Sequence, residues 1–225
     1  MRLRCAEHRL PQGPRNWRLQ WPSKIVNSSR MDCALNNMAE FPLEGSDTEQ
    51  LSVVMSTLYN VFQTHHESIE TTLQEITHAV RDCVPGADQA SISIARYGHA
   101  VQACAATGLV AAEVDSLQTE LGDGPCLHAL FECRAVSIPD MRTERRWPRF
   151  ALAAHVAGIG SMLSLKLFVE NAHLGALNLY SNKPRAFDSY SECIAFLFAT
   201  HAAIAAAGKL HEDSPSPIAP PEHNR

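Results

Sequence analysis

Residues that could take part in chemistry gather in one short stretch, residues 121–128. It holds two glycines, a proline, a thiol and an imidazole. Glycine lets the backbone approach a small molecule closely, and Cys126 and His128 could then contact that molecule with their side chains. We expect a small-molecule ligand here, bound by six residues of the stretch and one aromatic residue further along the chain. The predicted ligand-binding residues are Leu121, Gly122, Asp123, Gly124, Cys126, His128 and Trp147.

The two glycines allow two interpretations. Backbone amides near residues 122–124 could receive a carbonyl or phosphate oxygen of the ligand. Alternatively, Gly-Asp-Gly-Pro is a tight turn that precedes a helix. We expect a pocket at this position and keep the turn as the alternative.

The thiol of Cys126 also allows two interpretations. Near the start of a helix its pKa could be lowered, which would suit a nucleophile or a redox sensor. A free cysteine is, however, often a buried and inert core residue. We expect the buried residue and no catalytic residue, and keep Cys126 as the candidate for catalysis if the protein is a thiol enzyme.

Metal or haem binding is not predicted, although the chain has eleven histidines. His128 and His155 are nearest the expected pocket, and no His-x-x-x-His pair stands on one predicted helix. The cofactor, if one exists, is left unidentified. Four arginines at positions 142, 145, 146 and 149 form either a solvated face or a site for an anionic ligand or acidic partner.

The charge distribution excludes a general nucleic-acid-binding body. Residues 1–37 carry seven Arg or Lys against two acidic residues, whereas residues 38–225 carry twelve against twenty-two, a formal charge of −10 (12 − 22). The basic first segment fits a disordered extension upstream of a start at Met31 or Met38. A binding arm and an organellar presequence are its alternatives.

Signals for secretion or membrane insertion are not evident in the sequence. No continuous apolar run approaches the roughly 18 residues that span a bilayer. The seven cysteines include no C-x-x-C pair, which argues against a structural zinc site. We expect a cytoplasmic protein with free thiols and no membrane partner.

Apolar spacing predicts helices over residues 51–62 and 69–83, the second ending before Pro85. Strands are expected at 91–94, 101–105 and 134–138, and a hairpin joins 162–169 to 174–181 through a turn at 170–172. Shorter helices are expected at 111–117 and at 129–133. A further, alanine-rich helix is expected to end at about residue 157. Consecutive strands with hairpin links predict an α+β fold, an antiparallel sheet flanked by helices.

The last helix has the clearest predicted boundaries. A capping box, Ser189-x-x-Glu192, starts it, and Gly208 is expected to end it. Its predicted apolar stripe consists of Ile194, Leu197, Phe198, His201 and Ile204. A proline-rich tail follows over 211–225 and is expected to be disordered.

Four motifs occur in one order: Leu121-Gly-Asp-Gly-Pro-Cys-Leu, Arg146-Trp-Pro-Arg-Phe, Met162-Leu-Ser-Leu-Lys-Leu-Phe-Val and Leu174-Gly-Ala-Leu-Asn-Leu-Tyr-Ser. Together with the element order, they resemble a GAF domain, a PAS-like small-molecule sensor module, over residues 45–210. The residues of these motifs resemble, more narrowly, the GAF half of actinobacterial GAF–ANTAR regulators.

The resemblance implies a regulatory sensor in signal transduction or transcription. The RNA-binding ANTAR helices do not fit in the residues after the last helix, so output is expected through a homodimer or a partner regulatory protein. The alternative is a redox enzyme of the free methionine-(R)-sulfoxide reductase type using Cys126. That enzyme needs further cysteines on a nearby loop, and residues 141–150 contain none.

Overall fold

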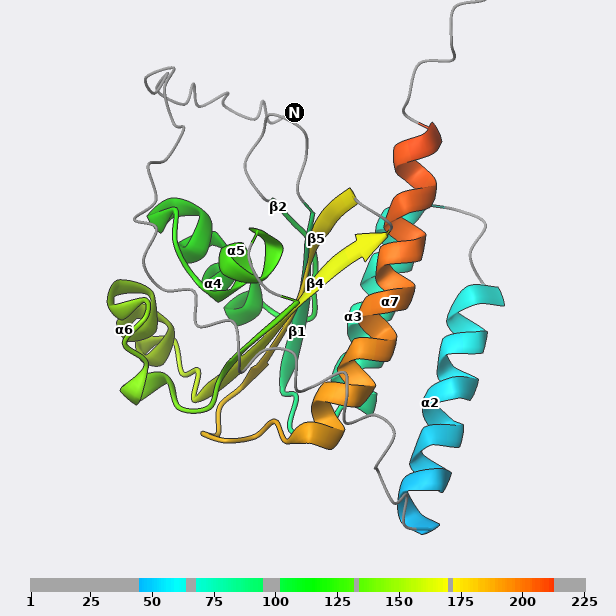
Figure 1. Cartoon of the computed structure of the whole chain (residues 1–225), viewed down its shortest axis with the longest axis horizontal. Coiled ribbons are helices and arrows are strands. Elements are labelled where there is room, and N and C mark those ends of the chain that lie inside the picture. Colours follow the sequence, from blue (N-terminus) through cyan, green and yellow to red (C-terminus); the bar gives the residue numbers. More distant parts are fainter. Residues whose placement is uncertain (1–44, 64–67, 95–101, 132–133, 170–171, 213–225) are drawn as a thin grey trace, which may run out of the picture. The chain divides into compact units, whose positions relative to one another are not determined.

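The computed structural model describes residues 45–63, 68–94, 102–131, 134–169 and 172–212. Figure 1 labels their elements, and the text keeps those labels. The elements in chain order are α2 (Gly45–Gln63), α3 (Ile69–Cys83), β1 (Gln89–Ile94), β2 (Gln102–Ala106), α4 (Leu109–Leu121), α5 (Pro125–Phe131), β3 (Ala135–Ile138), η2 (Met141–Thr143), α6 (Pro148–Val156), β4 (Ser161–Val169), β5 (Ala172–Ser181) and α7 (Ser189–Glu212).

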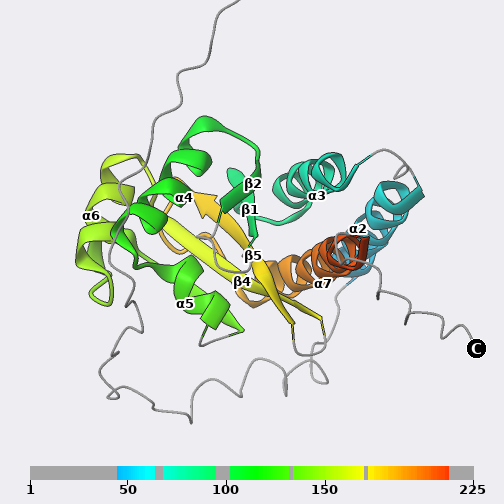
Figure 2. The same cartoon turned by 90° about the horizontal axis from the view of Figure 1, so that it is seen from above.

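One five-stranded sheet organises the fold, in the order β2-β1-β5-β4-β3 with every neighbouring pair antiparallel. Helices cover both faces: α3 and α7 lie on one, and α4, α5 and α6 on the other (Figures 1 and 2). The predicted α+β architecture is confirmed. Because β5 is the central strand, its alternate residues reach the middle of each helical layer.

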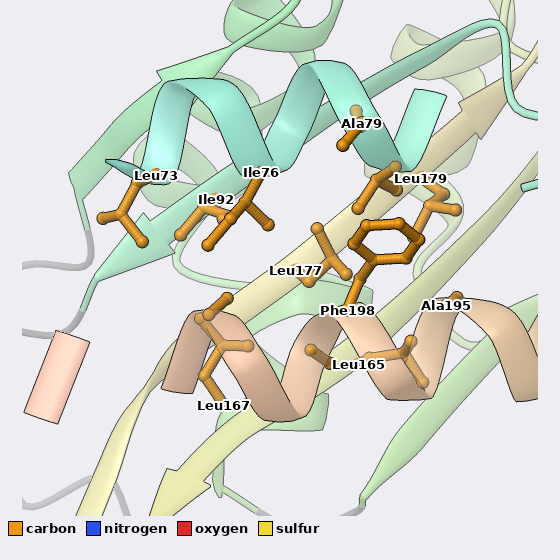
Figure 3. Packing of buried hydrophobic residues seen from close by; sticks show 14 of the residues in the cluster. Leu73, Ile76, Ala79, Ile92, Leu165, Leu167, Leu177, Leu179, Ala195 and Phe198 are labelled. Carbon is orange, nitrogen blue, oxygen red and sulfur yellow. The ribbon is translucent and has the colours of Figure 1, made fainter. Parts of the chain in front are cut away.

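The face under α3 and α7 is an apolar core. Leu165 of β4 and Leu177 of β5 are cross-strand partners, and Phe198 of α7 packs into the same cluster. Figure 3 shows these side chains meeting Leu73 and Ile76 of α3. Each of the five is at most 3% exposed. Burying such side chains supplies about 1.5–3 kcal/mol each, so this layer is where the stability of the fold is concentrated.

Helix α7 packs on the sheet through a face made mainly of alanines. Its buried residues are Ile194, Ala195, Phe198, Ala199, Ala202, Ala203 and Ala206. The predicted stripe is therefore wrong in part, since Ile204 is 53% exposed. Small side chains let the helix axis approach the strands closely, and periodicity weighted towards large residues overlooks them.

Two predicted boundaries of α7 need correction. Asp188, not Ser189, caps its N-terminus, because the Asp188 carboxylate accepts hydrogen bonds from the Ser191 amide (2.8 Å) and hydroxyl (2.9 Å). Gly208 does not end the helix, which continues to Glu212. One glycine costs a helix about 1 kcal/mol relative to alanine, which the good helix formers after it can offset.

A segment of α7, Ser189–Ala207, is long and apolar enough by composition to cross a membrane, the one such segment in the described part of the chain. Its apolar character has an explanation within the fold, because the helix supplies the alanine face that packs on the sheet.

Helix α2 lies outside α3 and α7 and contacts both (Figures 1 and 2). Val54 and Leu58 are buried in that contact, whereas Val53, Met55 and Tyr59 are more than half exposed. The predicted break between the first two helices is confirmed: α3 has a new N-cap, where the Ser68 hydroxyl accepts from the Thr71 amide at 3.2 Å.

The elements between β2 and β3 form the second layer. Helix α4 is longer than the predicted 111–117, and α5 begins at Pro125 rather than residue 129. Proline at the first position of a helix is favoured because its missing amide is not needed there. The predicted turn at 170–172 lies in part, at residues 170 and 171, outside the described residues, as do the extension 1–44 and the tail from 213.

Candidate functional site

The glycine stretch forms the turn between α4 and α5. Gly122 ends α4 in the left-handed conformation (φ 65°). Its amide donates to the Thr119 carbonyl at 3.3 Å, and the Asp123 amide donates to the Gln118 carbonyl at 3.2 Å. The amides of Gly122 and Asp123 are therefore used within the chain, and binding of a ligand oxygen by this stretch stays a prediction. The tight-turn interpretation describes the geometry.

Gly124 holds the turn against the side chain of Gln118. Its φ is 145°, and a Cβ at this position would lie 2.7 Å from Gln118 Oε1. That oxygen accepts a 2.7 Å hydrogen bond from the Cys126 amide. The second glycine thus allows Gln118 to reach past the turn and cap the first turn of α5.

Cys126 is buried at the start of α5, with 3% of its surface exposed. Burial is the main cause that raises its pKa to about 12, and the nearby Asp115 charge raises it further. The expected burial of Cys126 is confirmed. The alternative, a lowered thiol pKa, is wrong, because desolvation outweighs the effect of a seven-residue helix. The thiol stays protonated at neutral pH, which argues against a nucleophile in this conformation.

A set of polar side chains is buried on the sheet face under α4 and α5, and we call it the buried polar cluster. Every member is at most 4% exposed. Its members are Ser91 and Ser93 of β1, Asp115 and Gln118 of α4, Ser164 of β4, and Asn178 and Tyr180 of β5. Such a concentration of polar groups in a protein interior is uncommon, since each must find a hydrogen-bond partner.

Asp115 is the charged centre of this cluster. Its Oδ1 accepts hydrogen bonds from Asn178 Nδ2 (3.1 Å) and from the Tyr180 hydroxyl. Asn178 is held in turn by the Ser164 hydroxyl, which donates to its Oδ1 at 2.9 Å. Burial raises the pKa of Asp115 from 3.8 to about 6, although the polar side chains around the carboxyl, Ser91 among them, act in the opposite direction.

Two polar atoms of the cluster have no hydrogen-bond partner within the described part of the chain. They are Asp115 Oδ2, an acceptor, and Gln118 Nε2, a donor. A buried polar atom without a partner costs about 1–3 kcal/mol of folding free energy. These two atoms therefore mark a position at which hydrogen-bond partners are missing.

The other predicted ligand residues lie around the turn. His128 and Trp147 are brought together, with ring centroids 5.4 Å apart in an edge-to-face contact. Leu121 and Asp123 are half-buried at the end of α4, and Gly122 is exposed. The predicted residues therefore lie in the same layer as the buried polar cluster, but they do not include the side chains whose polar atoms are unpartnered.

The arginines near α6 form a solvated face. Arg142 pairs with Asp140 at 2.8 Å and Arg146 with Glu144 at 2.6 Å. Arg146 also stacks over Trp147 at 4.6 Å from the ring centroid. Two of the four positive charges are thus already matched by carboxylates, which weakens the interpretation as an anion site.

Two further features bear on ligand binding: the placement of metal-ligating side chains and a small cavity. Among the described residues, no group of three His, Cys, Asp or Glu side chains is placed to hold a metal ion, and His155 is exposed on α6. A small cavity of about 190 Å³ lies near Asp88, Val110 and Gly158. Tyr180 lines it as well and is the residue that it shares with the buried polar cluster.

Two patterns in the sequence could have revealed the cluster. Asp115 and Gln118 continue the helical spacing of Ala111 and Val114, so they share a face with these two buried residues. Ser91 alternates with Ile92 in β1, which predicts a strand with one polar face. Asn178 and Tyr180 share a face by the same rule, but the sequence does not show which helices cover it.

A family model described as GAF domain matches residues 66–207, more than half of the chain. The chain belongs to the GAF domain family. Its predicted family is thereby confirmed. The narrower resemblance to the GAF half of GAF–ANTAR regulators stays a prediction. No match was found among functionally curated proteins.

Solved structures with the same fold match this chain at low sequence identity. A GAF domain of a phosphoenolpyruvate-protein phosphotransferase from Coxiella burnetii superposes with a TM-score of 0.56, at 17% identity over 71% of this chain and 95% of that one. A free methionine-R-sulfoxide reductase from Neisseria meningitidis, in complex with its substrate, also gives 0.56, at 12% identity over 76% and 96%. The chromophore-binding domain of a bacteriophytochrome from R. palustris gives 0.56, at 14% identity over 75% and 63%.

Proposed function

We propose that this GAF domain is a sensor that binds a small molecule between the sheet and helices α4 and α5. The observation that carries the proposal is the buried polar cluster with its two unpartnered atoms. A layer built only for stability would place apolar side chains there, as the opposite face of the same sheet does. A ligand that supplies the missing hydrogen bonds would turn this cost into binding energy.

Movement of α4 and α5 is part of the proposal. The cluster is at most 4% exposed, so a ligand reaches it only when one of these helices shifts. Helix α5 is short, with only seven residues. Binding would therefore select or induce a displaced α4–α5 layer, which is the structural change a sensor needs.

Output would pass through a second protein chain, either a copy of this one or a partner regulatory protein. Helix α2 exposes Val53, Met55 and Tyr59, and α7 exposes Ile204. The two helices contact each other, so one partner chain could reach both. Homodimerisation is checked by sedimentation equilibrium of the chain and of a Tyr59→Asp variant, in which a dimer through α2 would dissociate.

The sensing function is tested by native mass spectrometry after incubation with a metabolite extract and removal of unbound molecules. We expect the wild-type chain to carry a discrete additional mass that is released on denaturation. Asn178→Leu, which removes the donor to Asp115 and adds apolar bulk, should lose that mass. Asn182→Leu is the matched control, because Asn182 follows the same strand but is exposed.

Retention of the same mass by Asn178→Leu would place the ligand elsewhere and contradict the proposed site. Wild-type protein that carries no added mass from extracts of several growth conditions would contradict the sensing function itself.

A further inference from the structure

Asp115 and Gln118 share an arrangement that the rest of the cluster does not have. Each is held through one of its two polar atoms and leaves the other without a partner. Asp115 is held through Oδ1 by Asn178 and Tyr180, leaving Oδ2. Gln118 is held through Oε1 by the Cys126 amide at 2.7 Å, leaving Nε2.

The chemical identity of the free atoms follows from their neighbours. The backbone amide of Cys126 can only donate, so it must face the oxygen of Gln118, and the NH₂ group points away from it. Asn178 Nδ2 and the Tyr180 hydroxyl both donate to one oxygen of Asp115, which leaves the other oxygen as an acceptor. The unpartnered pair is therefore one acceptor and one donor.

Both side chains are fixed in position. Asn178, which holds Asp115, is itself held by Ser164 at 2.9 Å. Gln118 lies against Gly124 so closely that a Cβ there would be 2.9 Å from its Cγ. These contacts define which polar atom of each side chain is engaged in the unliganded domain and which is left over.

The two free atoms come from neighbouring positions on one helix. Residues three apart in a helix face the same side, with Cβ atoms about 5–6 Å apart. A single small group can therefore meet both. To pair them, it must offer a donor to Asp115 Oδ2 and an acceptor to Gln118 Nε2, side by side.

We propose that the ligand of this site presents the cis edge of an amide, its N–H donating to Asp115 Oδ2 and its C=O accepting from Gln118 Nε2. Lactams, cyclic ureas and primary carboxamides have this edge. The inference rests on the proposed sensing function and specifies the chemistry of its ligand.

Ligands that carry a charge fit the two unpartnered atoms less well than a neutral amide does. An anionic ligand would meet the Asp115 carboxylate, and none of the groups that hydrogen-bond to it in the described structure is a cation. A cation with donors only would satisfy Asp115 but leave Gln118 Nε2 unpaired. A neutral amide satisfies both and buries no further charge.

Three six-membered probes test the inference with the wild-type chain. 2-Piperidone has the complete edge, N-methyl-2-piperidone lacks the N–H, and cyclohexanone has only the carbonyl. Binding is followed on the side-chain NH₂ signal of Gln118 in protein labelled with ¹⁵N-glutamine, assigned through its loss in Gln118→Leu. We expect 2-piperidone to shift that signal and to bind at least about tenfold more tightly than either of the other probes.

Asp115→Asn supplies the second arm, because it replaces the acceptor Oδ2 by a donor of the same shape. We expect it to lose the preference for 2-piperidone over cyclohexanone, whereas Glu113→Gln, an exposed acid on the same helix, keeps it. Should Asp115→Asn fail to fold, the comparison of the three probes on the wild-type chain still tests whether the ligand binds through an amide edge.

Equal binding of 2-piperidone and its N-methyl analogue would overturn the amide edge while leaving a small-molecule site in place. A Gln118 signal that no probe shifts, up to the millimolar concentrations at which such fragments bind, would mean that buried water satisfies both atoms, and would also overturn it. The sensing function is decided separately, by the mass that the native chain carries from the extract.

Discussion

The two faces of the sheet differ more from each other than any other two regions of this molecule. Under α3 and α7, strands β1, β4 and β5 bury leucine, isoleucine and alanine against further apolar side chains. Under α4 and α5, the alternate residues of the same strands are Ser91, Ser164 and Asn178, which surround a buried aspartate. The second face also has an apolar cluster of its own, which includes Phe150 and Met162. The strands thus supply an apolar core on one side, and on the other side a polar centre beside a second apolar cluster.

This difference separates stability from function within one domain. The apolar face gains free energy from every side chain it buries. The polar face contains a carboxylate with a raised pKa and two unpartnered atoms, each of which costs free energy in the unliganded protein. Changes to the first face should destabilise the fold, whereas changes to the second should alter its response to pH and ligands.

The largest effect is expected for Phe198→Ala on the apolar face. Phe198 is fully buried, so its truncation should lower the free energy of unfolding by about 3–5 kcal/mol, through lost burial and the cavity left behind. Urea denaturation measures the change. Phe196→Ala, on the same helix but only partly buried, should cost clearly less, and equal losses would contradict the assignment of the core face.

The next effect is the pH dependence that Asp115 imposes. Its pKa is raised from 3.8 in the unfolded chain to about 6 in the folded one. The fold therefore favours the protonated acid: the stabilisation is complete below about pH 4 and is lost as the pH rises through about 6. A shift of this size corresponds to about 3 kcal/mol.

The free energy of unfolding, measured between pH 4 and pH 7 for the wild type and Asp115→Asn, isolates this contribution. We expect the wild type to lose stability relative to the variant across that range. Parallel pH profiles would show that the carboxyl is not buried as described.

Gly124→Ala should cost about 2 kcal/mol, since it combines a strained φ of 145° with a Cβ only 2.7 Å from Gln118 Oε1. The control is Gly122→Ala, where φ is 65° and no atom lies within 4 Å, so only the left-handed conformation costs energy, about 1 kcal/mol. Thermal unfolding compares the two. A Gly124 variant no less stable than the Gly122 variant would mean that Gln118 is free to move away.

The smallest effect is expected at the cap of α7. Asp188→Ala should lower the free energy of unfolding by about 1 kcal/mol, because two hydrogen bonds to Ser191 are lost at the helix start. Ser189→Ala should be nearly neutral, since Ser189 is exposed and lies inside the helix. The opposite order in urea denaturation would restore the capping box predicted from the sequence.

The sequence predicted the fold well where side-chain periodicity is set by burial. The β4–β5 hairpin and the end of α3 before Pro85 follow from alternation and from proline chemistry, and both are confirmed. The capping box predicted for α7 started the helix at the wrong residue, because Asp188 also suits a cap and only the hydrogen bonds show that it is the one used.

The buried polar cluster was not predicted from the sequence, and ligand binding by residues 121–128 stays a prediction. Residues 121–128 drew attention through their glycines, yet their conformation serves the turn between α4 and α5. Asp115 and Asn178 lie 63 positions apart and meet only because β5 passes under α4. Similarly, the pKa of Cys126 follows from burial by residues distant in the sequence, which a local rule about helix starts does not include.

The most direct test of the account is hydrogen–deuterium exchange of the full chain with and without the molecule that it carries from a metabolite extract. We predict that the molecule slows exchange of backbone amides in α4 and α5, residues 109–131, and leaves the buried amides of α3 unchanged. Protection confined to other elements, or unchanged exchange throughout α4 and α5, would contradict a ligand site over the polar face of the sheet.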